Sequence, residues 1–306
     1  MKNRFFAIIA CLVLVAGIHA QVGENPNDAS IAQLYSEAEA GDMTAQFNLG
    51  TRFYDGNGVK QNFKKAAEWY TKAASQGLVY AEYNLGLMYE QGKGVKKNKE
   101  IAAQLYRSAA DKGYPNAMLS IGNAYFKGEG VTQDFEEAAK WFTKASQNGL
   151  TSGSLNLGNA YYRGDGVEQN YKRAVRMYEL CAQQKHPTAL MMLGTCYEEG
   201  QGVNQDYEKA IEYYKEAAEL GQMSALNNLG RIYMEGRGVP VDMDEAIKYY
   251  DMAIAKGNPE ALYNKAIIYY QGRGVERNRK EAKKLMKQAA AKGLSQARYF
   301  LDHNKF

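Results

Sequence analysis

Apolar residues along the chain fall into short segments with helical spacing, and glycine-rich turns separate these segments. In the first copy, Ala45, Leu49 and Phe53 recur at a spacing of four, which is typical of one apolar helix face. Gly56 predicts the end of that helix, because glycine readily adopts the left-handed conformation found at helix ends. Asn62 predicts the start of a second helix, since its side chain can cap the free N–H groups of the first turn. The apolar face of this second helix would consist of Ala66, Trp69, Tyr70 and Ala73.

This pair of helices recurs every 36 residues. The sequence Gly56-Asn57-Gly58-Val59 returns as Gly92-Lys93-Gly94-Val95, and again at Gly128, Gly164, Gly200, Gly236 and Gly272. An Asn or Asp occupies the Asn62 position in every copy: Asn98, Asp134, Asn170, Asp206, Asp242 and Asn278. Since one helix hairpin cannot bury both of its faces, such a period predicts an array of stacked units rather than a single core.

A glycine also lies inside the first helix of six copies, at Gly50, Gly86, Gly122, Gly158, Gly194 and Gly230. Glycine in a helix interior is less favourable than alanine by about 1 kcal/mol. Six repetitions of an unfavourable residue predict an offsetting gain, and we expect a close approach of the neighbouring helix at these positions.

The repeated string Ala-x-x-x-Leu-Gly-x-x-Tyr-x-x-Gly-x-Gly-Val, followed by Asn or Asp and then by Ala, Tyr and Ala-Ala-x-x-Gly, resembles the Sel1-like repeat. That repeat is an α/α hairpin related to the tetratricopeptide repeat. The resemblance covers seven units and implies an all-α, right-handed superhelical solenoid of about sixteen helices, including a cap at each end. Three positions depart from the pattern: Gly153 replaces an alanine, Lys185 a terminating glycine, and Lys265 a leucine or isoleucine.

The predicted organisation has four parts. A signal peptide spans 1–20, a polar linker and an N-terminal capping helix span 21–40, the seven repeats span 41–293, and a C-terminal capping helix and tail span 294–306. The signal peptide is predicted from a basic start, a short apolar run and a small-residue exit, with cleavage after Ala20. We therefore expect a periplasmic or secreted protein without membrane insertion after cleavage.

The charge balance gives no reason to expect a nucleic-acid partner. The formal net charge of +4 falls to +2 once Lys2 and Arg4 are removed with the signal peptide. Cys181 and Cys196 would remain after cleavage. If the chain turns between two antiparallel helices, the two thiols lie ~10 Å apart along the helix axis, which is too far for a disulfide. Two buried, unbridged thiols are therefore predicted.

Candidate chemistry is sparse. The Gly-x-Gly-Val turns follow helices and not strands, which argues against a phosphate-binding loop. The histidines left after cleavage, His186 and His303, have no neighbours with metal-ligand spacing, so no metal or cofactor is predicted. Some cysteine-rich secreted members of the resembled family have been described as penicillin-binding proteins or weak β-lactamases. Here no Ser-x-x-Lys sequence and no cysteine pair in each hairpin accompanies the repeat, so no catalytic residue is predicted.

One pattern indicates binding. The residues Asn48, Asn84, Asn156, Asn228 and Asn264 share one position of the first helix, opposite the apolar stripe at about 100° per residue. Ser120 and Met192 interrupt this amide ladder. The aromatic residues Phe47, Tyr83 and Tyr263 precede the position by one residue, and Tyr54, Phe126, Tyr162 and Tyr270 lie further along the same side.

The tetratricopeptide resemblance implies that first helices line a concave groove. The ladder and Tyr83, Tyr162 and Tyr263 would then bind a protein or peptide segment, with amides paired to its backbone and aromatics as anchors. The alternative is that the asparagines only bridge neighbouring helices. We expect a non-enzymatic interaction scaffold. A cell-wall or β-lactam hydrolase and a regulatory subunit of an envelope enzyme or sensor are the alternative functions.

Overall fold

The computed structural model describes residues 29–304 and folds them into sixteen helices, with no strand in that range. The predicted all-α class and helix number are confirmed. The predicted signal peptide and the linker as far as residue 28 lie outside the described residues. The helices are α2 (Ala29–Glu39), α3 (Met43–Asp55), α4 (Phe63–Ser75), α5 (Val79–Gln91), α6 (Lys99–Asp111), α7 (Pro115–Lys127), α8 (Phe135–Gln147), α9 (Thr151–Arg163), α10 (Tyr171–Ala182), α11 (Pro187–Glu199), α12 (Tyr207–Glu219), α13 (Met223–Glu235), α14 (Met243–Ala255), α15 (Pro259–Gln271), α16 (Arg279–Ala291) and α17 (Ser295–His303).

Both predicted helix signals act as expected. In α4, the Asn62 side chain accepts a hydrogen bond from the backbone N–H of Lys65 at 3.0 Å. The equivalent Asn or Asp caps the other six second helices in the same way. The first helices end at a glycine in the left-handed region, for which Gly56 with φ of 73° is an example. Each hairpin is thus bounded by its own sequence.

The glycines inside the first helices are sites of close packing, as predicted. A Cβ atom added at Gly50 would lie 2.7 Å from the ring of Tyr70, on the second helix of the same hairpin. The other five positions face Tyr or Phe in the same way. The seventh repeat supports the explanation, because it has Ala266 in place of glycine and Met286 in place of the ring, and both are fully buried. The small residue and the ring are therefore a matched pair.

The second glycine of each turn connects successive repeats. A Cβ atom at Gly94 would collide with the backbone carbonyl of Phe63, at the start of the second helix of the preceding repeat. Gly130 faces Lys99 one repeat further on, and Gly202 faces Tyr171. The second glycine of the Gly-x-Gly turn therefore has a packing role between repeats.

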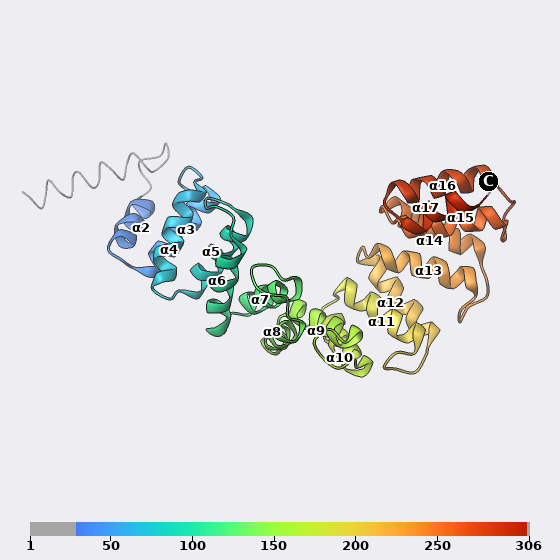
Figure 1. The fold of residues 1–306 in the computed structure, drawn as a ribbon, viewed down its shortest axis with the longest axis horizontal. Coiled ribbons are helices and arrows are strands. Elements are labelled where there is room, and N and C mark those ends of the chain that lie inside the picture. The colour runs from blue at the N-terminus through green and yellow to red at the C-terminus, as the bar shows by residue number, and fades with distance from the viewer. Residues whose placement is uncertain (1–28, 305–306) are drawn as a thin grey trace, which may run out of the picture. The chain divides into compact units, whose positions relative to one another are not determined.

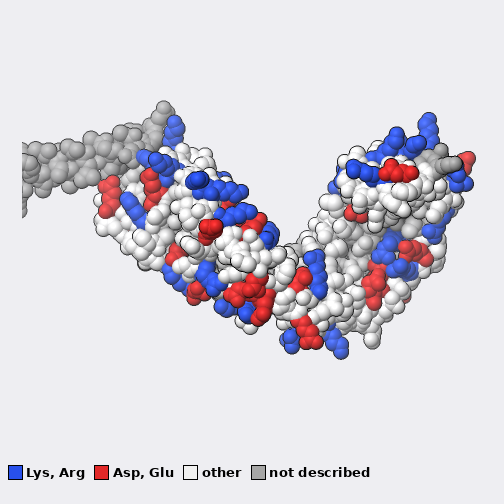
Figure 2. All heavy atoms as spheres, viewed as in Figure 1, with Lys and Arg blue, Asp and Glu red and all other residues white. Residues whose placement is uncertain are grey.

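The helices form two compact units, unit 1 up to Gly153 and unit 2 from Ser154. Within unit 1, the first helices α3, α5 and α7 form one row and the second helices α4, α6 and α8 form the other (Figure 1). Aromatic and aliphatic side chains from both rows build the core, including Phe53, Tyr70 and Tyr106. Over the visible face of each unit, basic and acidic side chains are interspersed (Figure 2).

The three departures from the repeat have structural explanations. A Cβ atom at Gly153 would lie 2.7 Å from the Cβ atom of Ala145, so alanine does not fit there. Lys185 takes the left-handed conformation of the glycine that it replaces, with φ of 54°. Lys265 stands at a core position and directs its ammonium group to the carboxylate of Asp251.

Candidate protein-binding surface

We call the surface that carries the amide-ladder positions, turned away from the second helices, the first-helix face. In unit 1 it is formed by α3, α5 and α7, and in unit 2 by α11, α13, α15 and the part of α9 from Ser154. On α3 the division is clear, because Leu49, Gly50 and Phe53 are buried against the hairpin while Asn48 is exposed. Each unit therefore presents its own first-helix face.

The N-terminal end of the face in unit 1 is hollow. A pocket of about 520 Å³ lies between α2 and α3, lined by Gln33, Leu34 and Glu37 from α2 and by Asn48 and Asp55 from α3, among others. The helix α2 corresponds to a second helix whose own first helix is lacking among the described residues. Its polar side chains occupy positions where the other second helices present apolar ones, which suits a helix that ends a stack.

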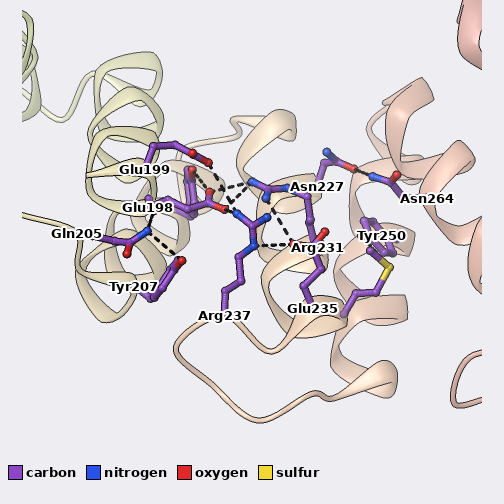
Figure 3. Close-up of polar contacts among 12 residues, drawn as sticks. Glu198, Glu199, Gln205, Tyr207, Asn227, Arg231, Glu235, Arg237, Tyr250 and Asn264 are labelled. Atoms are coloured by element: carbon purple, nitrogen blue, oxygen red, sulfur yellow. Dashed lines mark hydrogen bonds and ion pairs between the residues drawn. The ribbon is translucent and has the colours of Figure 1, made fainter. Parts of the chain in front are cut away.

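The ladder residues differ in what they contact. The Asn84 side chain hydrogen-bonds to the phenol of Tyr70 in the preceding repeat. The Asn264 amide donates to the Asn227 side-chain oxygen at 3.0 Å, also across a repeat boundary (Figure 3). These two amides therefore bridge neighbouring helices, the structural role that we considered as the alternative. Asn156 and Asn228 are half-buried in unit 2, and Asn48 is the most accessible of the five residues.

The predicted aromatic residues are half-buried and packed against other rings. Tyr83 lies 5.1 Å from Tyr114 and 5.7 Å from Tyr106, measured between ring centroids. Tyr162 lies edge-on to Tyr171 at 5.3 Å, and the ring of Tyr263 meets that of Phe300 at 6.2 Å. The structure thus holds the rings in fixed orientations, which reduces the entropy lost if a partner binds to them.

A charged cluster in unit 2 was not predicted from the sequence. Glu198, on α11, is 1% exposed, and its carboxylate contacts Arg231 at 2.7 Å and Arg237 at 3.0 Å (Figure 3). The phenol of Tyr214 donates to the same carboxylate at 2.8 Å. Burial raises the pKa of Tyr214, and the neighbouring charge of Glu198 raises it further. Arg237 also pairs with Glu235 at 2.6 Å, so both guanidinium groups are held by carboxylates.

The residue between the two glycines of a turn can contact a side chain of the preceding repeat. Arg237 occupies that position, and it reaches back to the preceding repeat. In unit 1, Lys93 occupies the same position and donates to the phenol of Tyr54 at 3.2 Å. The sequence does contain a signal for such a cluster. Glu90 and Glu198 occupy the position of Tyr54, which is aromatic in most of the other repeats.

Within residues 29–304, no group of three or more His, Cys, Asp or Glu side chains is placed to hold a metal ion. None of the described helices is both long enough and apolar enough to cross a membrane. Cys181 and Cys196 are buried and unbridged, as predicted.

Comparison with known proteins agrees with this architecture. The Sel1 repeat profile matches seven consecutive segments: 44–78, 79–114, 115–150, 152–186, 187–222, 224–258 and 259–294. The chain belongs to the Sel1 repeat family. Sel1-repeat proteins are generally non-catalytic and generally mediate protein–protein interactions.

Two solved structures are similar over most of the chain. One is c5321, a protective antigen of uropathogenic Escherichia coli with an SLR fold, at 34% identity and a TM-score of 0.77. The match covers 89% of this chain but only 58% of c5321. The other is a Sel1 repeat protein from Oxalobacter formigenes, at 30% identity and a TM-score of 0.74, with 94% of this chain and 85% of that chain covered.

A curated relative matches locally. The putative Sel1-like repeat-containing protein L18 of Acanthamoeba polyphaga mimivirus is 46% identical over 43 residues. That segment is 14% of this chain and 7% of the viral protein. The comparisons thus identify the repeat and its fold.

Proposed function

We propose that this protein is a non-enzymatic scaffold of the cell envelope or the exterior that binds a protein segment along its first-helix face. The observation that carries the proposal is the combination of exposed or half-buried amides with fixed aromatic rings on that face. Amides can pair with a peptide backbone, and rings held in place supply binding energy at low entropic cost. The predicted signal peptide supports the location.

The contacts of the ladder asparagines decide which of them can be replaced to test binding. Replacing Asn84 or Asn264 would remove a bond between repeats, so a loss of binding would not distinguish the binding role from the structural one. Asn48 in unit 1 and Asn228 in unit 2 are better positions. The substitutions Asn48→Glu and Asn228→Glu place a charge on the face of each unit without touching a bond described above.

Exposed amides on the second helices offer matched controls. Gln104 on α6 and Gln288 on α16 are exposed, so Gln104→Glu and Gln288→Glu make the same change of charge away from the first-helix face. The measurement is affinity capture from the native envelope with mature protein Gln21–Phe306 as bait. We expect one partner to be retained by the controls and lost by the first-helix variants. A partner that all variants retain would place the binding site elsewhere.

A further inference from the structure

Unit 1 contains a pocket that the amide pattern did not reveal, and Ser120, at a ladder position, places the pocket at the border of the first-helix face. It has a volume of about 150 Å³ and lies where α5 and α6 meet α7. Its polar lining includes the Glu90 carboxylate, the Tyr106 phenol and the side chains of Ser120 and Asn123. Since a water molecule occupies ~30 Å³ in the liquid, the pocket has room for one planar polar side-chain group.

The origin of the pocket is visible in the sequence. Two of the positions that line the pocket carry a pair of aromatic rings in other repeats. The ring centroids of Tyr54 and Phe63 lie 5.2 Å apart, and those of Phe126 and Phe135 also lie 5.2 Å apart. In the second repeat these positions hold Glu90 and Lys99. The apolar filling is therefore replaced by charged side chains.

An equivalent carboxylate in unit 2 is paired with guanidinium groups. Three repeats later, Glu198 corresponds to Glu90 and Tyr214 to Tyr106. The phenol donates to the carboxylate at 2.8 Å in both places. At Glu198 the arrangement is completed by two guanidinium groups, with Arg231 at 2.7 Å.

At Glu90 the completing cations are missing. The positions of Arg231 and Arg237 are taken by Asn123 and Glu129. Among residues 29–304, Glu90 accepts from the Tyr106 phenol and makes no ion pair.

The other charges in the lining do not supply the missing cation. Lys99 pairs with Glu129 at 2.9 Å. Lys127 is exposed, and its charge acts on Glu129. Glu90 is therefore the carboxylate of the pocket without a cationic neighbour in contact.

We propose that this pocket receives a guanidinium group from the bound protein segment, so that an arginine of the partner takes the place that Arg231 takes beside Glu198. The inference rests on the proposed function, because the arginine belongs to a segment bound along the first-helix face. It adds a specificity determinant, namely one basic side chain at a fixed position. Ser120 connects the pocket to the predicted aromatics, since it hydrogen-bonds to Tyr83.

The first test needs no partner. Asn123→Arg places a guanidinium at the position of Arg231, and Asn123→Leu is its control, since Leu87 occupies the same position in the second repeat. We expect the arginine variant to have a higher denaturation midpoint than the leucine variant. That difference should vanish when both carry Glu90→Gln. An equal difference in the two backgrounds would overturn the proposal.

The second test uses a displayed random peptide library as the probe. With the unmodified protein we expect arginine to be enriched at one peptide position by about tenfold, the ratio that one charge-assisted hydrogen bond gives. The enrichment should be lost with Glu90→Gln and with Asn123→Arg. It should persist with Glu68→Gln, which removes an exposed carboxylate from α4.

The outcomes separate the two proposals. Peptides selected on the first-helix face without enrichment of arginine would overturn the pocket assignment and leave the proposed function standing. Selection of no peptide at all would count against the proposed function, and the pocket assignment would fall with it.

Discussion

The packing of glycine against a ring makes a quantitative prediction, and Gly122 is the best position to test it. Its partner Phe142 is 3% exposed and has no hydroxyl group, so no hydrogen bond complicates the result. A Cβ atom at Gly122 would lie 2.7 Å and 2.8 Å from two ring atoms of Phe142 and 3.3 Å from the Cβ atom of Trp141. Carbon atoms prefer about 3.5–4.0 Å, so the ring would have to move by roughly 1 Å.

The expected change follows from two opposing effects. Overpacking of this kind costs about 1–3 kcal/mol, while the replacement of a helical glycine by alanine gains about 1 kcal/mol. We therefore expect Gly122→Ala to destabilise α7 and α8 by up to about 2 kcal/mol. With Phe142→Met, which imitates the natural pair of Ala266 and Met286, the same substitution should instead stabilise by up to about 1 kcal/mol.

Hydrogen exchange of the α7 and α8 amides is the appropriate assay, because a repeat array can open locally without unfolding as a whole. The free energies of opening of the four proteins in the cycle give the coupling between the two positions, for which we expect about 2 kcal/mol. If Gly122→Ala stabilised both backgrounds equally, the ring would not be confining the glycine, and the explanation of the helical glycines would be wrong.

Three further predictions concern buried groups. Burial raises the pKa of the Cys181 thiol to about 11 and that of Cys196 to about 12, so alkylation at pH 8 should be slow in the folded protein and fast in denaturant, as mass spectrometry can measure. Glu198→Gln leaves two partly exposed guanidinium groups without their shared carboxylate and should destabilise unit 2 by about 2 kcal/mol, whereas an unchanged denaturation midpoint would show that the cluster adds no net stability. Burial also raises the pKa of Tyr35 to about 12 from an ordinary value of 10.0, so its contribution to stability is complete below pH 10 and declines as the pH rises towards 12. The difference in absorbance at 295 nm between the protein and its Tyr35→Phe variant should therefore show this phenol ionising near pH 12 and not near pH 10.

The sequence predicted those features that repeat. The Asn62 cap, the Gly56 terminus and the space at Gly50 each depend on residues within one 36-residue unit, so seven copies provide the same signal. The contacts of Glu198 could not be predicted in this way. Arg231 and Arg237 are 33 and 39 residues away, so contact depends on how far one repeat is displaced against the next. The two roles of the asparagines were likewise undecidable from one helix, because the partner of Asn84 lies in the preceding repeat.

Glu90 and Glu198 indicate how an array of this kind can acquire a specific site. Glu90 and Glu198 occupy the same position of their respective hairpins, and each carboxylate accepts a hydrogen bond from a tyrosine phenol at 2.8 Å. What differs is the next repeat, where Asn123 and Glu129 occupy the positions of Arg231 and Arg237. The glycines, rings and caps hold these neighbours at constant positions whatever their identity. A few substitutions can therefore change a saturated ion-pair cluster into an open carboxylate pocket without altering the fold, and a departure from the repeat is where a binding site should be sought.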